Sequence, residues 1–177
     1  MGKKSSLPIS PNSVTTSIDL SGSGEFQERA ESIATRIEKW YIQPLLRMDG
    51  NQGLLVLMVL FPLYEKHLRM LYNMDDKFTS GHRIFRTIGK HLELNENDAY
   101  LFWTNMRNGL LHRAIPKTED DFRYGIRESG KAVDLLDKCF WINPFALRDR
   151  ILMEIRPHLQ KWRCDDTPIP KTFSPIR

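Results

Sequence analysis

The stretch from Gln52 to Met74 constrains the fold of this 177-residue chain more than any other part of it. Its first half, from Gly53 to Tyr64, is apolar nearly all round, and a helix without a polar face has to lie inside the protein. The apolar run is too short to span a bilayer, and it contains Pro62, which we expect to kink the helix. The second half is polar on one side, where it carries Glu65, Lys66, His67 and Arg69. The sequence therefore predicts a central helix against which the rest of the chain packs.

Further helices are predicted wherever apolar residues recur at steps of three and four. We expect them from near Glu25 to Pro44, from Gly81 to Leu92, from a cap at Asn95 or Asn97 to just before Pro116, and from about Phe145 to Trp162 with a late interruption at Pro157. Most tryptophans sit at apolar helical positions, so we expect core packing rather than base stacking for Trp40, Trp103, Trp141 and Trp162.

The segment from residue 122 to residue 142 is ambiguous. Its first residues, Phe122 to Ile126, alternate like a strand, a turn fits at 128–130, and Cys139 to Ile142 can pair back. Apolar residues between Ala132 and Phe140 also fit a helix. We favour a small β-hairpin.

The predicted fold class is all-α, an up-and-down bundle of four to five helices with a small β-hairpin or irregular insert before the last helix. Residues 1–24 are rich in Ser, Thr, Pro and Gly and are expected to form a flexible leader. Residues 163–177 contain three prolines and are expected to form an extended tail. The helical domain then spans residues 25–162.

Charge and cysteine content narrow the function classes only slightly. The formal net charge of +4 permits a nucleic-acid partner without requiring one. Cys139 and Cys164 have neither the spacing of a zinc site nor that of a disulfide framework, which fits a reducing compartment. No apolar core follows the first residues, so we expect no secretory signal. A cytoplasmic protein without a membrane segment, metal or cofactor is the expectation.

Six residues near the end of the fourth predicted helix carry the chemistry: Arg107-Asn108-Gly109-Leu110-Leu111-His112. Arginine is always cationic and fits phosphate through its planar fork. Histidine can accept and donate protons near neutral pH. Asn108 and His112 stand four residues apart and share a helix face, which the long side chain of Arg107 can also reach. A fixed cation beside a proton shuttle is the minimum equipment for cleaving an RNA phosphodiester without a metal.

This arrangement resembles the HEPN superfamily of all-α domains, many of which are ribonucleases of toxin, antiviral-defence and RNA-processing systems. The family signature is an arginine, four to six residues of which the first is often asparagine, and then a histidine. The resemblance covers residues 25–162 in architecture but only these six residues in motif. Spacing alone is a weak signal, since Arg86 and His91 also stand five apart.

The resemblance implies an endoribonuclease that leaves a 2′,3′-cyclic phosphate and a 5′-hydroxyl. His112 would act as general base on the 2′-hydroxyl or general acid on the leaving oxygen, Arg107 would stabilise charge on the phosphate, and Asn108 would hold His112 or a phosphate oxygen. Arg113 would bind the RNA backbone. The family arrangement also implies a symmetric homodimer with both motifs in one cleft, for which Gly53–Tyr64 and the motif helix are candidate contact surfaces.

Further partners follow from the resemblance alone: RNA as substrate, and an antitoxin or defence-system protein as regulator. Ala114 stands where HEPN toxins silenced by nucleotide transfer carry a tyrosine, so that form of regulation is not supported. On the earlier helix, Glu65 and Arg69 are candidate substrate-binding residues, and with His67 they can orient Arg107 or His112, or simply form a solvated face.

The main alternative is structural. Arg107 can pair with Glu65 or Asp98, and His112 can favour the helix C-terminus, without any catalysis. The chain would then be a non-catalytic helical interaction or scaffold module, or an antitoxin-like partner protein.

Overall fold

The computed structural model describes residues 24–74, 78, 83–114, 116 and 122–164. The leader expected at 1–24 and the tail expected at 163–177 lie outside these residues, except for Gly24 and for residues 163 and 164, which belong to helices.

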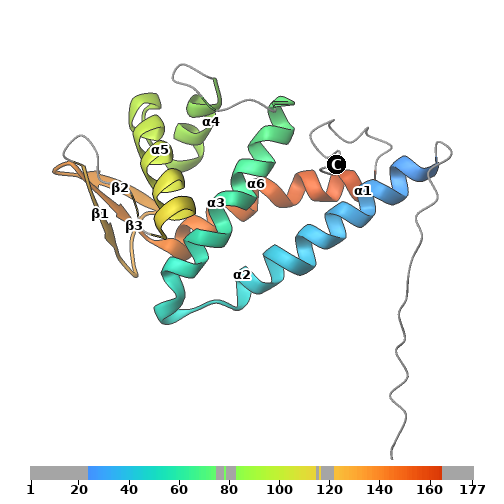
Figure 1. Ribbon diagram of the computed structural model, residues 1–177, viewed down its shortest axis with the longest axis horizontal. Helices are drawn as coiled ribbons and strands as arrows, with labels where there is room; N and C mark the ends of the chain where they lie inside the picture. The colour runs from blue at the N-terminus through green and yellow to red at the C-terminus, as the bar shows by residue number, and fades with distance from the viewer. Residues whose placement is uncertain (1–23, 75–77, 79–82, 115, 117–121, 165–177) are drawn as a thin grey trace, which may run out of the picture.

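Helices make up most of the described chain (Figure 1). Their bounds are α1 Gly24–Ile37, α2 Gln43–Arg47, α3 Gly53–Tyr72, α4 Arg83–Leu92, α5 Glu96–Arg113 and α6 Pro144–Cys164. A π-helical segment, Glu38–Ile42, joins α1 to α2, and a 3₁₀ turn, Gly50–Gln52, leads into α3. The helix α6 packs along α1 and α3, while α4 packs against α5.

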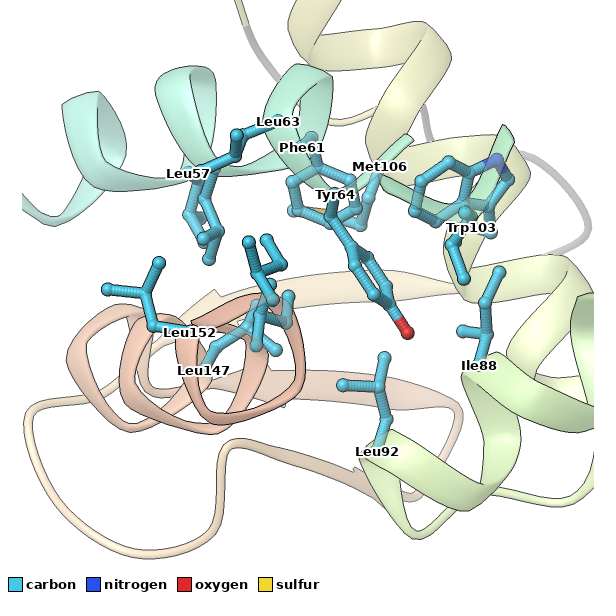
Figure 2. Close-up of a cluster of buried hydrophobic side chains, with 14 of the residues drawn as sticks. Leu57, Phe61, Leu63, Tyr64, Ile88, Leu92, Trp103, Met106, Leu147 and Leu152 are labelled. Carbon is cyan, nitrogen blue, oxygen red and sulfur yellow. The ribbon is translucent and has the colours of Figure 1, made fainter. Parts of the chain in front are cut away.

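The predicted central helix is confirmed as α3, which packs against α2, α5 and α6. Its inward face meets side chains from three other helices in one core, as Figure 2 shows for Leu57, Phe61 and Tyr64. The helix continues through Pro62 to Tyr72, and the left-handed backbone of the next residue, Asn73, directs its N–H to the carbonyls of the last turn. The expected interruption of the last helix at Pro157 is wrong, because α6 continues to Cys164.

The all-α prediction is also wrong, because residues 122–142 contain a three-stranded mixed sheet. Its strands are β1 Arg123–Ile126, β2 Val133–Leu136 and β3 Cys139–Ile142, in the order β1-β3-β2. The sheet packs beside α5, so the molecule is not a simple up-and-down bundle (Figure 1).

The predicted hairpin contains two segments that do pair in the structure, but the predicted antiparallel direction of their pairing is wrong. Residues 123–126 do pair with 139–142, but parallel, and the antiparallel partner of β3 is β2. The reason is the two-residue turn at Asp137 and Lys138, which both have positive φ, the backbone that joins adjacent antiparallel strands with their natural twist. With β2 on one side of β3, β1 occupies the other edge.

Successive side chains of β3 point to opposite faces of the sheet. Phe140 and Ile142 are buried, and the Phe140 ring lies 5.4 Å from the ring of Phe102 on α5. Trp141 points to the opposite face and is exposed. One face of the sheet therefore closes the core over α5, and the other lies outside it.

Candidate functional site

The six-residue motif forms the last turns of α5. Asn95 caps the start of this helix by accepting a hydrogen bond from the Asp98 N–H at 2.9 Å. The helix ends at Ala114, whose left-handed backbone lets its N–H donate to the Leu110 carbonyl. Leu110 is buried, so the motif is carried on a helix anchored in the core.

Arg107 is held by a two-point ion pair to Glu65 of α3. Its Nε donates to Glu65 Oε2 at 2.8 Å and its Nη2 donates to Glu65 Oε1 at 3.1 Å. Such a fork-to-fork pair fixes the plane of the guanidinium group. Arg107 keeps 29% of its side-chain surface exposed, against 11% for Glu65. Glu65 therefore fixes the orientation of the Arg107 guanidinium group from one side, and the other side of the group is open to solvent.

Arg69 of α3 completes a cluster with Glu65 and Arg107. Its Nη2 and Nε donate to Glu65 Oε1 at 2.8 Å and 3.1 Å, and its guanidinium carbon lies 4.7 Å from the centre of the Phe78 ring. Burial alone would raise the pKa of the Glu65 carboxyl, but the hydrogen bonds from Arg107 and Arg69 outweigh it and hold that pKa below its usual value. Two guanidinium groups and one carboxylate leave one net positive charge beside the motif.

The other two polar residues of the motif, Asn108 and His112, have different environments. Asn108 Oδ1 accepts a hydrogen bond from Arg107 Nη1 at 3.0 Å, so the amide braces the guanidinium group. His112 lies one turn further along α5, and its side chain is exposed. The side chain of Arg113, the predicted backbone-binding residue, lies outside what the structure describes.

The second Arg–His pair with the same spacing forms no such arrangement. Arg86 is exposed and pairs with Glu96, whereas the His91 ring contacts Tyr64 Oη at 2.7 Å and lies 3.4 Å from the Glu154 carboxylate. Within α4, the pair is therefore divided between solvent and the helix interface.

His67 lies apart from the cluster, although the sequence groups it with Glu65 and Arg69. The side chain is only 5% exposed, and its ring packs at 5.0 Å against the ring of His158 on α6. Its Nε2 atom has no hydrogen-bond partner among the described residues. Since Glu65 and His67 are both buried, the interpretation of this segment as a solvated face is wrong, while Glu65 does orient Arg107.

The apolar run Gly53–Tyr64, a candidate dimer surface, lies mostly in the core. Its large side chains with substantial exposure are Leu54 at 36% and Leu55 at 52%, near the start of α3. The prediction of core packing is wrong for Trp40, which is 66% exposed, and for Trp141. The position of Trp141 between the inward residues Phe140 and Ile142 of a strand signals an outward side chain.

Within the described ranges, the structure offers neither a metal site nor a helix that could span a membrane. No group of three or more His, Cys, Asp or Glu side chains in these ranges is placed to hold a metal ion. No helix within them has the length and apolar character needed to cross a bilayer. Compared with protein-family models, curated proteins and solved structures, the chain finds no match.

Proposed function

We propose that the chain is an endoribonuclease that cleaves RNA at Arg107, Asn108 and His112 without a metal ion. The observation that carries the proposal is the fixed guanidinium group of Arg107, held by Glu65 on one side and partly open on the other. The exposed His112 follows on the same helix, about 1.4 turns beyond Arg107. A positioned cation and a proton-transfer group are what this reaction requires.

In the proposed reaction, His112 takes the proton of the RNA 2′-hydroxyl, and the 2′-oxygen forms a bond to the adjacent phosphorus. The bond from phosphorus to the 5′-oxygen breaks, and that oxygen receives a proton. The products are a 2′,3′-cyclic phosphate and a 5′-hydroxyl end. In a symmetric homodimer, the partner subunit's His112 supplies the second proton-transfer group, so that one ring acts as base and the other as acid.

Arg107 stabilises the charge that develops on the phosphate. A guanidinium group carries more N–H donors than its bonds to Glu65 and Asn108 use, so it can donate to a phosphate oxygen without releasing either partner. Arg69 adds the excess positive charge of the cluster and contributes to substrate attraction. DNA is refused because it lacks the attacking hydroxyl.

The biological setting we propose is cytoplasmic, with the protein acting as a toxin or antiviral-defence effector restrained by a partner protein. This part of the proposal is supported by the resemblance of the motif alone.

A second candidate function is a non-catalytic helical interaction module. The ion pair between Arg107 and Glu65 favours it, because the pair ties α5 to α3 and gives the arginine a purely structural use. The two functions differ in what they require of His112. An interaction module does not depend on an exposed imidazole at the end of α5, whereas the nuclease does.

The test is cleavage of mixed RNA in EDTA by the purified full chain. The variants are Arg107→Ala and His112→Ala, with Arg86→Ala as the matched control, because Arg86 is the arginine of the pair with the same spacing. We expect the wild-type chain and the control to cleave, and both motif variants to lose at least 100-fold in rate, the order of magnitude that acid–base catalysis contributes. Cleavage unaffected by either motif substitution, or no cleavage by folded wild-type protein, would favour the interaction module.

A further inference from the structure

The outer face of the three-stranded sheet carries a row of residues defined by the strand register. Trp141 of β3 pairs with Gly125 of β1 on one side and with Asp134 of β2 on the other. Residues paired across neighbouring strands point to the same face, so these three lie side by side. The helices cover the opposite face of the sheet (Figure 1). On that face, Phe140 packs against Phe102 of α5.

The Trp141 ring is seated directly on the backbone of β1. A Cβ atom at position 125 would lie 2.4 Å from Trp141 Cζ3 and 2.5 Å from Cε3, closer than any side chain tolerates. Glycine at this position therefore lets the six-membered ring lie over the strand. The indole keeps 37% of its surface exposed. Contact with the β1 backbone holds the indole in one orientation, so the ring forms a fixed aromatic surface.

Arginines flank this ring on the outer face. Arg123 is exposed on β1, two residues before Gly125 and therefore on the same face. Arg127 follows two residues after Gly125, and its Nη2 lies 3.4 Å from the Asp134 carboxylate. Since Arg127 balances Asp134, the row keeps the positive charge of Arg123. An aromatic surface with excess cationic charge complements a base attached to a phosphate backbone.

The size of the face argues against a folded protein as occupant. Three strands of four residues cover about 14 Å by 13 Å, or about 180 Å², from ordinary strand spacings. A stable protein–protein interface needs about 800 Å² from each partner. The face is thus a fraction of what a second copy requires, whereas it suits one or two nucleobases.

We propose that the outer face of the sheet binds single-stranded RNA, with one nucleobase stacked on Trp141 and the neighbouring phosphate held by Arg123. The proposal rests on the ribonuclease function argued above, for which it supplies a substrate-binding surface separate from Arg107 and His112. Stacking on an indole does not distinguish one base from another strongly, so this surface contributes affinity more than sequence preference.

The test measures binding of a fluorescein-labelled oligouridine and an oligoadenosine by anisotropy, in EDTA and in the His112→Ala background, so that the RNA stays intact. We expect Trp141→Ala to weaken binding about 5- to 100-fold and Trp141→Phe to retain most of it. Gly125→Val, which lifts the ring without removing it, should also weaken binding. The matched control is Trp40→Ala, since Trp40 is 66% exposed on the π-helical segment.

Unchanged RNA affinity in folded Trp141→Ala protein, or an equal loss in the Trp40 control, overturns the inference. So does a shift from dimer to monomer caused by Trp141→Ala with RNA affinity unchanged, which would assign the face to a second copy. Cleavage by the chain with His112 intact is measured in parallel. Cleavage that does not depend on Trp141 would support the nuclease and contradict the RNA-binding surface. RNA binding that depends on Trp141, without any cleavage, would support the surface and contradict the nuclease.

Discussion

Replacing His67 with phenylalanine should make the protein less sensitive to acid. The imidazole is buried between α3 and α6, packed on the His158 ring, and its Nε2 has no hydrogen-bond partner within the described ranges. Burial lowers the pKa of His67 to about 3, with the nearby His158 and His91 adding to the effect. The folded protein therefore keeps this ring neutral at pH values where the unfolded chain protonates it.

The size of the effect follows from the two pKa values. Below the ordinary pKa of about 6.5, the unfolded chain binds a proton that the folded protein excludes, so the free energy of unfolding falls by about 1.4 kcal/mol per pH unit. The fall continues until the pH approaches the lowered pKa of His67. Between pH 7 and pH 5, His67 alone should cost about 2 kcal/mol of stability.

Urea unfolding followed by circular dichroism at pH 7 and pH 5 measures this quantity. We expect the wild-type chain to lose about 2 kcal/mol more than His67→Phe over this interval. The variant keeps a ring of similar size against His158, and it keeps His91 and His158, whose pKa values are also lowered by burial. His112→Phe, the same change at an exposed histidine, is the matched control for the substitution itself. Equal slopes for wild type and His67→Phe would refute the reasoning.

Three further substitutions test other parts of the account by chemical denaturation. Gly89→Ala should cost about 1 to 3 kcal/mol, because a Cβ there would lie 2.5 Å from the Leu94 carbonyl oxygen; an unchanged midpoint would contradict that contact. Asn143→Ala should cost about 1 to 2 kcal/mol, because Asn143 Oδ1 accepts from two N–H groups in the first turn of α6; a midpoint equal to that of the wild type would contradict the capping role. Glu65→Ala should lower both stability and the rate of RNA cleavage, because it leaves Arg107 without its two-point partner, and a variant that cleaves at the wild-type rate would remove the positioning role.

The helices were largely predictable from the sequence because their apolar residues recur with the helical period. The central helix and the cap at Asn95 agree with the structure, whereas the second half of α3 buries Glu65 and His67 instead of exposing them to solvent. The continuation of α6 through Pro157 was not predictable, because whether a proline ends a helix depends on how the flanking turns pack. In α6, Leu159 and Trp162 are buried beyond the proline.

The three-stranded sheet is the part of the fold that the sequence predicted least well, because it depends on strand pairing, which the periodicity of residues does not encode. The residues of β2 fit a strand or a helix equally well in sequence, and only contact with β3 decides between them. The turn at Asp137 and Lys138 carries no glycine to signal its positive φ values. Parallel pairing of β1 with β3 joins segments separated along the chain, and no local pattern encodes it.

The candidate site was predictable in its composition but not in its contacts. The motif residues lie on α5 as the helical spacing requires, and one contact, the Arg107–Glu65 pair, is among the structural alternatives that the sequence offers. The burial of His67 and the outward position of Trp141 depend on which elements pack together, so the residue types alone could not supply them.

The central claim is that His112 drives attack by the RNA 2′-hydroxyl. The most direct measurement compares an RNA oligonucleotide with its 2′-O-methyl counterpart, incubated in EDTA with the wild-type chain or with His112→Ala, and identifies the product ends by mass spectrometry. The account predicts cleavage of the ribose form alone, by the wild-type chain alone, with 2′,3′-cyclic phosphate and 5′-hydroxyl ends. Cleavage of the 2′-O-methyl RNA, or cleavage that survives the loss of His112, would contradict it.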